Sequence, residues 1–280
     1  DVIENFRESF SYAIEEVKAW NNTLKNRMLD SSFKKDWDTA MNSELSDIEW
    51  PSYEPGQNIA TRKVWGAVIE AMAPTFKSLV GGSADLEPSN VTAGFAKMVD
   101  DFSKDNHSGR NFAYGVREFP MGAINNGIAQ HGGLKVFGAS FFVFSDYERP
   151  AIRLRALQNL PVITEYTHDS IFVGEDGPTH QPIEHLMACR AIPNLLVLRP
   201  CDANEAVVAS KIAFEQKEYP SLVLFSRQGL PVLDREKYPS ADEFRKGAYI
   251  ISDSIGDPDI SIFASGSEVP LVLEVKDSLK

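Results

Sequence analysis

The sequence predicts an α/β fold: a parallel sheet flanked by helices on both faces, preceded by a helical linker and followed by the start of a C-terminal α/β domain. Two observations support this prediction. Short apolar runs alternate with helical segments from about residue 60 onwards, and Trp50–Gln57, with two prolines and a glycine, separates this part from a polar helical start. Apolar strands that alternate with helices are typical of a parallel sheet covered on both sides.

The expected strands and helices follow from the positions of these runs. We expect strands at Leu79–Val80, Asn111–Tyr114, Lys135–Ala139, Val162–Tyr166, Leu195–Leu198 and Leu222–Phe225. We expect helices at about Ala60–Met72, Glu118–Gln130, Phe144–Gln158, Ile183–Arg190 and Asn204–Gln216. Further along, strand-like Ala248–Ile251 and Ile260–Ala264 precede Ser265–Glu268 and a last helix.

The two ends of the chain differ from its middle. Residues from about Ile3 to Leu45 are expected to be helical, with one apolar stripe formed by Phe6, Phe10, Ile14, Val17 and Trp20. We therefore divide the chain into a helical linker (1–57), an α/β domain (58–240) and the start of a C-terminal domain (241–280). The chain begins in a helical pattern without Met and ends in another without a Gly or Asn stop. We expect both ends to be cuts in a longer polypeptide.

Composition excludes several classes of partner. The chain has 28 basic and 40 acidic residues, a net charge of -12, which disfavours nucleic acid and anionic membranes. Neither a signal segment nor an apolar stretch of about 20 residues is present, so we expect a cytoplasmic protein. Cys189 and Cys201 are too far apart for a C-x-x-C metal pair and are expected to be buried thiols.

Polar clusters follow the expected strands, where parallel sheets bind ligands. Gly81–Leu86 (GGSADL) follows the first strand; a plain turn would explain it, but Asp85 can accept a hydrogen bond. Glu118 follows the second strand at a helix start, where a carboxylate often only complements the helix dipole. Its apolar neighbours Val116 and Phe119 would raise a carboxyl pKa, so Glu118 could share a proton with a ring nitrogen.

An aromatic segment follows the third strand. Most rings of Phe137–Tyr147 (FGASFFVFSDY) are expected to fill the core, but the turn at Ser140 and Phe141 could present a ring that stacks on a heteroaromatic cofactor. Ser226–Gln228 closes the last strand, and its Arg227, like Arg62, is either a surface charge or a phosphate clamp.

The densest set of titratable groups lies in the loop after the fourth strand. Two His and two Asp occur within 13 residues: His168, Asp169, Asp176 and His180. These are suitable metal ligands, but their spacing fits no helical H-x-x-x-H arrangement, so a functional loop without metal is favoured. Asp176-Gly177 followed by Asn204 is similar to the G-D-G…N metal motif of thiamine-diphosphate enzymes. Because position 175 is Glu and Asn204 begins a helix, we interpret this as coincidence.

Taken together, these segments resemble the transketolase family. The resemblance runs from about Ala60 to Glu268 in the family's order, and the most specific segment is GEDGPTHQPIE. The matching segments are GGSADL (81–86), REF (117–119), THDSI (167–171), GEDGPTHQPIE (174–184), RP (199–200) and SRQ (226–228). The chain departs from the family at Phe119, where some members have His, and at Phe172, where a small residue is usual.

The resemblance implies transfer of a two-carbon ketol unit between sugar phosphates with thiamine diphosphate and Mg²⁺ or Ca²⁺. It implies that Glu118 bonds the aminopyrimidine ring nitrogen, which favours the imino tautomer that removes the thiazolium C2 proton. The other implied cofactor contacts are stacking by Phe141, pocket walls from Phe144 and Tyr147, and Asp85 near the cofactor. The implied substrate contacts are His168 and His180 to sugar oxygens, Asp176 to a hydroxyl, and Arg62, Ser89, His168 and Arg227 around the phosphate.

The resemblance also implies what this chain lacks. The metal ligands belong to the family's diphosphate-binding domain, so we expect no metal ligand in this chain. The implied partners are that missing domain and a homodimer partner, which would cover apolar residues near Glu118 and Phe141. These apolar residues are Phe119, Met121, Ile124, Phe142 and Phe144. The alternatives are a dihydroxyacetone synthase or deoxyxylulose-phosphate synthase, and a non-catalytic or split-subunit half of such an enzyme.

Overall fold

The computed structural model describes residues 1–42, 45–254 and 256–279. The chain forms two compact units, Asp1–Glu44 and Leu45–Lys280, which are described separately. Ile48, which the sequence prediction placed in the helical linker, is buried within the second unit. The predicted domain limits at 57/58 and 240/241 stay predictions.

The first unit consists of two helices, α1 (Val2–Arg27) and α2 (Ser31–Asn42). The predicted helical start is therefore interrupted, because the Asp30 carboxylate accepts hydrogen bonds from the backbone N–H groups of Ser32 and Phe33 and begins a new helix. The predicted end of this segment, at positions 43–45, lies partly outside the described residues. The predicted apolar stripe lies on α1, where the side chains of all five of its members are exposed.

A parallel sheet forms the centre of the second unit, as predicted, and it has five strands in the described residues where six were expected. Its strands are β2 (Leu79–Ser83), β3 (Lys135–Phe141), β4 (Ile163–Thr167), β5 (Leu196–Leu198) and β6 (Ser221–Phe225). They lie in the order β2-β3-β4-β6-β5 and every neighbouring pair is parallel. Strands β2, β3, β4 and β6 are buried along their whole length, which explains why Lys135 and Glu165 are their only charged residues.

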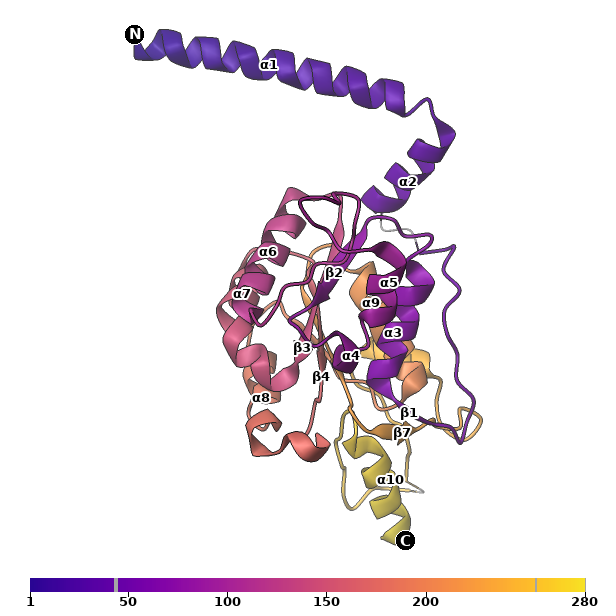
Figure 1. The fold of residues 1–280 in the computed structure, drawn as a ribbon. Helices are drawn as coiled ribbons and strands as arrows, with labels where there is room; N and C mark the ends of the chain where they lie inside the picture. Colours follow the sequence, from indigo (N-terminus) through magenta and orange to yellow (C-terminus); the bar gives the residue numbers. More distant parts are fainter. Residues whose placement is uncertain (43–44, 255, 280) are drawn as a thin grey trace. The chain divides into compact units, whose positions relative to one another are not determined.

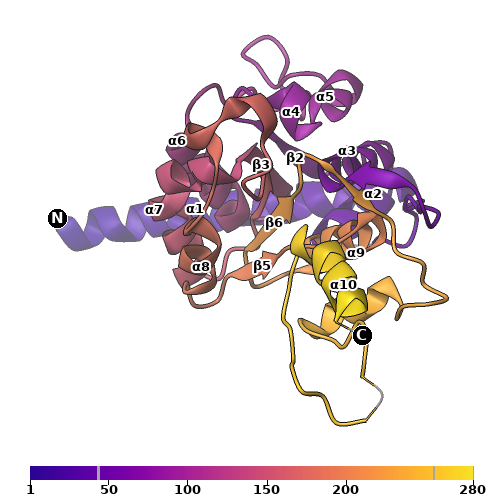
Figure 2. The ribbon, with the colours of Figure 1, turned by 90° about the horizontal axis from the view of Figure 1, so that it is seen from below.

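Helices cover both faces of the sheet, as Figures 1 and 2 show from two directions. One face carries α3 (Thr61–Met72), α5 (Ala93–Val99) and α9 (Ala203–Glu215), and the other carries α6 (Glu118–His131), α7 (Ser145–Leu157) and α8 (His185–Arg190). The core beneath α3 and α9 centres on Trp65, whose ring stacks on Phe214 at 5.6 Å and meets Phe137 edge-on at 5.6 Å. Such aromatic packing fixes the helices on the sheet.

Shorter elements complete the second unit. A small antiparallel pair joins β1 (Asn58–Ala60) to β7 (Gly229–Pro231). The remaining elements are α4 (Glu87–Asn90), α10 (Glu268–Ser278) and the 3₁₀ turns η1 (Phe142–Phe144), η2 (Gly174–Asp176), η3 (Pro178–His180) and η4 (Ala241–Lys246). No helix in the described part of the chain is both long and apolar enough to cross a bilayer.

Three of the predicted strands do not form. Asn111–Tyr114 makes only an isolated bridge beside β2, because the Phe112 N–H to Gly81 carbonyl bond is the last one before the chain turns away toward α6. Ala248–Ile251 and Ile260–Ala264 form no strand, because no described segment pairs with either of them and an unpaired strand leaves its backbone groups unbonded. The last predicted helix is present as α10.

Candidate functional site

The candidate site lies at the carboxyl edge of the sheet, where β3, β4 and β6 end together. The strand register places Phe141 opposite Thr167, and Thr167 opposite Phe225. The residues that follow these strands, including His168 and Arg227, are therefore neighbours in space although they are far apart in sequence. This arrangement follows from the parallel topology alone.

An aromatic cluster occupies this edge. The rings of Phe141 and His168 stack with their centres 3.8 Å apart, and Phe144 lies parallel to Phe141 at 5.9 Å. His180 meets Phe144 edge-on at 5.4 Å and Phe141 at 6.0 Å. Tyr147 extends the cluster from Phe144 to the surface, where it is 64% exposed. The structure thus brings together five residues that the sequence placed in one site.

His168 is buried, as Phe141 is, at 3% exposure, and it has a positive φ of 59°. Burial, together with the nearby Arg62, Arg227 and His180, lowers the pKa of its imidazole to about 3. The ring is therefore neutral near pH 7. Its Nε2 atom lies 3.7 Å from Asp176 Oδ2, so His168 and Asp176, which are both predicted to contact the sugar, lie beside each other.

Two arginines approach the same point from different elements. Arg62, at the start of α3, donates from Nη1 to the Ser89 carbonyl at 2.8 Å, and Arg227 donates to Glu175 Oε2 at 3.2 Å. Burial and the charge of Arg227 lower the pKa of the Arg62 guanidinium, whereas Asp176 raises this pKa. Arg227 is near enough for its charge to act on Arg62, and together the two guanidinium groups offer positive charge to an anionic group.

Glu118 begins α6 and is 7% exposed. Within the described residues no group hydrogen-bonds its carboxylate, and no bond or ring contact joins Glu118 or Asp85 to the aromatic cluster. Asp85 is exposed, with a positive φ of 63°. Glu118 is thus a buried acid with free hydrogen-bonding capacity, and the helix that it begins lies on the sheet face opposite α3.

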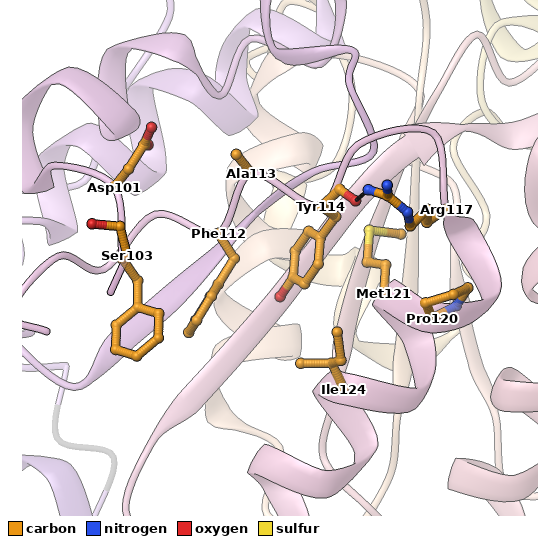
Figure 3. A pocket seen from close by; sticks show the side chains of 10 residues that line it. Asp101, Ser103, Phe112, Ala113, Tyr114, Arg117, Pro120, Met121 and Ile124 are labelled. Carbon is orange, nitrogen blue, oxygen red and sulfur yellow. Dashed lines mark hydrogen bonds between the residues drawn. The ribbon is translucent and has the colours of Figure 1, made fainter. Parts of the chain in front are cut away.

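A cavity of about 480 Å³ lies beside the first turn of α6 (Figure 3). Its lining is mostly apolar, and Pro120, Met121 and Ile124 of α6 face it together with Phe112 and Tyr114. Asp101, Phe102, Ser103, Ala113 and Arg117 complete the lining. The sequence did not predict this cavity, because the segment around residues 100–110 has no helical or strand pattern that places it against α6.

The predicted apolar partner surface needs a correction. Met121 and Phe142 belong to the core, at 0% and 1% exposure, because α6 and η1 turn these side chains toward the sheet. Phe119 and Ile124 are exposed, at 46% and 48%. The exposed apolar surface near Glu118 is therefore smaller than the sequence suggested.

Two of the residues weighed as metal ligands, Asp169 and Asn204, have other partners. Arg199 donates from Nε to Asp169 Oδ2 at 2.7 Å, so an ion pair occupies this potential ligand. Asn204 exchanges two hydrogen bonds with the backbone of Tyr53 and so holds the segment before β1. A different group, Asp146, Glu184 and His185, has ligand atoms within 4.8 Å of one another, and Arg149 and His185 already bond the Asp146 carboxylate.

Buried polar residues near the site were missed by sequence reasoning. Glu165 in β4 is fully buried with both carboxylate oxygens lacking a partner among the described residues, and burial raises its pKa well above the ordinary range despite the opposing charge of Arg62. Asn90 at the end of α4 is also fully buried and bonds to the ends of β3 and β4. For Asn90 a signal existed, because its short segment directly follows the polar GGSADL turn.

Comparisons with known proteins agree with this geometry. Residues 57–232 match the family model described as transketolase, pyrimidine binding domain. The transketolase of Halalkalibacterium halodurans is 48% identical over 270 residues, which cover 95% of this chain and 40% of the relative. The transketolase of Geobacillus stearothermophilus is 51% identical over 230 residues, which cover 82% of this chain and 34% of the relative.

Solved structures show the same likeness. Transketolase from Leishmania mexicana superposes with a TM-score of 0.89 at 38% identity, covering 98% of this chain and 41% of its own. Transketolase of Pichia stipitis in complex with sedoheptulose-7-phosphate gives 0.88 at 38% identity, covering 96% of this chain and 40% of its own. A split gene transketolase, described as an inactive beta4 tetramer, gives 0.53 at 28% identity over 64% of this chain and 55% of its own.

The chain spans about two fifths of the length of the curated relatives it matches. The family model covers more than half of this chain, and the same region holds every predicted site residue. The resemblance found in the sequence is thereby confirmed, and the chain belongs to the transketolase pyrimidine-binding domain family.

Proposed function

We propose that this chain supplies the pyrimidine-binding half of a transketolase active site, in which a two-carbon ketol unit passes from a ketose phosphate to an aldose phosphate. The observation that carries this proposal is the convergence of the aromatic cluster, two histidines and two arginines at the carboxyl edge of β3, β4 and β6. The aromatic cluster at this edge offers a surface on which a flat ring can stack, and the two arginines offer positive charge for a phosphate.

The residues present fit thiamine diphosphate as the cofactor. Glu118 offers a buried carboxyl group with free hydrogen-bonding capacity, and Phe141, Phe144 and Tyr147 offer an aromatic wall. When bound, thiamine diphosphate supplies the carbon nucleophile that accepts and releases the ketol unit. In this proposal Glu118 holds a proton at its carboxyl oxygen for the ring nitrogen of the aminopyrimidine, Phe141 stacks on that ring, and Asp85 lies in the cofactor region.

The proposed substrate contacts follow from the charges at the site. Arg62 and Arg227 bind the phosphate, because planar guanidinium groups meet phosphate oxygens at two points, and Ser89 holds Arg62. His168 and His180 contact the sugar oxygens, and Asp176 accepts from a hydroxyl. Two structures of the Pichia stipitis relative contain sedoheptulose-7-phosphate and fructose-6-phosphate, ligands of the proposed class.

The proposed enzyme needs more than this chain. We propose that Mg²⁺ or Ca²⁺ is bound by a diphosphate-binding domain outside this chain, and that the active enzyme is a cytoplasmic homodimer. Phe119 and Ile124 are exposed apolar residues on the helix that begins with Glu118, where a partner would cover them.

A complementation assay tests this proposal. The chain is mixed with the diphosphate-binding segment of the Halalkalibacterium halodurans transketolase, thiamine diphosphate and Mg²⁺, and ketol transfer between sugar phosphates is measured. We expect activity from the mixture and none from either part alone. Turnover by the pure chain alone would contradict the division of the site between two domains. A complex that forms and binds cofactor, yet transfers no ketol unit, would contradict the assigned reaction.

A second candidate is a half of a split enzyme that is inactive by itself. The structural likeness to the inactive split gene transketolase favours keeping this candidate. The same assay distinguishes the two. Activity that returns only with a separately encoded diphosphate-binding protein from the same source would support the split enzyme.

A further inference from the structure

A chain of buried hydrogen bonds runs from β2 to His168. The Ser83 hydroxyl lies 2.7 Å from Asn90 Oδ1, Asn90 Nδ2 lies 2.9 Å from Thr167 Oγ1, and Thr167 Oγ1 lies 2.9 Å from His168 Nδ1. Ser83, Asn90 and Thr167 are each 0% exposed. Because water does not reach these three side chains, each hydrogen on them needs an acceptor within the chain of bonds.

The orientation of the Asn90 amide is fixed by its surroundings. One hydrogen of Nδ2 donates to the backbone carbonyl of Ser140 at 3.0 Å, and a carbonyl oxygen can only accept. The amide nitrogen must therefore face Ser140, and the second Nδ2 hydrogen then points to Thr167 Oγ1. On its other side, Asn90 Oδ1 accepts from Ser83, whose own Oγ accepts from the Leu86 N–H at 3.0 Å.

The Thr167 hydroxyl determines which ring nitrogen of His168 carries the hydrogen. Its oxygen already accepts from Asn90, so its single hydrogen needs an acceptor. His168 Nδ1, at 2.9 Å, is the remaining partner that the structure gives to this hydroxyl among the described residues. A neutral imidazole that accepts at Nδ1 carries its hydrogen at Nε2. The opposite tautomer would leave the buried Thr167 hydrogen without an acceptor.

We propose that Asn90 and Thr167 are positioning residues that hold His168 as its Nε2–H tautomer, so that this ring offers a hydrogen-bond donor to the substrate. The substrate part rests on the proposed function; the tautomer part does not. The Nε2 atom is the ring nitrogen nearer to Asp176, at the centre of the charged groups of the site. A donor at this point selects substrates with a carbonyl or hydroxyl oxygen there, and cannot take up a proton from them.

The tautomer is measured by ¹⁵N NMR of the 280-residue chain with labelled histidines. The sequence holds five His, and His168→Gln identifies the signals of interest. We expect Nε2 to carry the hydrogen and Nδ1 to show the shift of an unprotonated acceptor. A hydrogen at Nδ1 in the unaltered chain would overturn the proposal.

Three variants separate positioning from general support of the fold. Thr167→Ser keeps the hydroxyl and is expected to keep the Nε2–H form, whereas Thr167→Val is expected to give a mixture of both tautomers. Asn90→Asp removes the donor to Thr167, so the hydroxyl is free to donate to the new carboxylate, and we expect the hydrogen of His168 to move to Nδ1. An unchanged tautomer in folded Thr167→Val or Asn90→Asp would overturn the proposal.

The kinetic consequence is tested separately in the complemented enzyme. We expect Thr167→Val to raise KM for the sugar phosphates, and Thr167→Ser to restore it. If the chain proved to have another activity, the NMR result would still decide the tautomer. If the tautomer responds as expected but KM does not change, the substrate part of the proposal is wrong and the positioning part stands.

Discussion

Gly122 on α6 packs so closely against Glu148 on α7 that a methyl group on its Cα would lie 2.7 Å from Glu148 Oε1. The same methyl group would lie 2.8 Å from Arg155 Nη2. Glu148 and Arg155 form an ion pair in which both side chains are fully buried. Gly122 lies one helical turn after Glu118, so this contact holds the start of α6 against the buried ion pair of α7.

Gly122→Ala is expected to destabilise the chain by about 1–3 kcal/mol, because the added methyl group meets a buried ion pair that has no room to move. Gly127→Ala is the matched control in the same helix. A Cβ there meets no atom within 4 Å, and Ala favours a helix over Gly by roughly 0.5–1 kcal/mol. Urea unfolding of the three chains measures both effects. Changes of the same sign and size in both variants would show that the close packing at Gly122 has no energetic consequence.

The buried ion pair itself gives a second prediction. Arg155 donates to Glu148 and to Thr164 Oγ1, and the Tyr166 hydroxyl donates to the other oxygen of Glu148. Arg155→Met alone is expected to cost about 3–5 kcal/mol of stability, because it leaves a buried carboxylate without its cation. Combined with Glu148→Met, the loss is expected to be smaller than for Arg155→Met alone. A double variant that loses the sum of both single effects would contradict coupling between the two charges.

This pair also shows where sequence reasoning ends. A helix was predicted at about Phe144–Gln158, but the burial of Glu148 and Arg155 on it was not. Glu148 and Arg155 are two turns apart and share a face, and the sequence alone does not say that this face meets β4. The parallel sheet and its flanking helices were predictable because the buried strands are short runs with few charged residues between helical segments. The carboxyl-edge site was predictable because parallel strands end together.

Contacts across long sequence distances were not predictable. Asn90 bonds to Thr167 because α4 packs against the ends of β3 and β4, and no local sequence pattern predicts this packing. Asn111–Tyr114 has the composition of a strand, yet its neighbour β2 pairs with it at a single point. Whether an apolar segment becomes a strand depends on a partner that the segment itself does not encode.

The two arginines give a prediction about substrate choice. In the complemented enzyme, Arg227→Ala and Arg62→Ala should each remove a charge-assisted hydrogen bond worth about 1.5–3 kcal/mol. This corresponds to a rise of roughly tenfold to a hundredfold in KM for phosphorylated acceptors, with little change for unphosphorylated glycolaldehyde. Arg245→Ala is the control, since Arg245 pairs with Glu215 on an exposed surface. Equal losses for phosphorylated and unphosphorylated substrates would contradict a phosphate clamp.

His168 gives a prediction about acid stability. Burial lowers the pKa of this imidazole to about 3 in the folded chain, whereas an unfolded histidine binds a proton near its ordinary pKa of 6.5. Between these two values the unfolded chain binds more protons, so the folded chain loses stability as the pH falls from about 6.5 towards 3. His168→Gln is expected to make unfolding less dependent on pH in this window. The exposed His131→Gln serves as the control; an equal change in that variant would contradict the assignment.

The central claim, that Glu118 holds a proton for the pyrimidine of the cofactor, is tested most directly by the turnover of Glu118→Gln in the complemented enzyme. Gln keeps the hydrogen-bonding shape but cannot exchange a proton, so kcat should fall by about 10²–10⁴-fold while KM for the sugar phosphates changes little. Glu87→Gln, which also alters an acid in the first turn of a helix, is the matched control and should leave kcat near that of the unaltered chain. A kcat for Glu118→Gln within a fewfold of the unaltered enzyme would contradict the account.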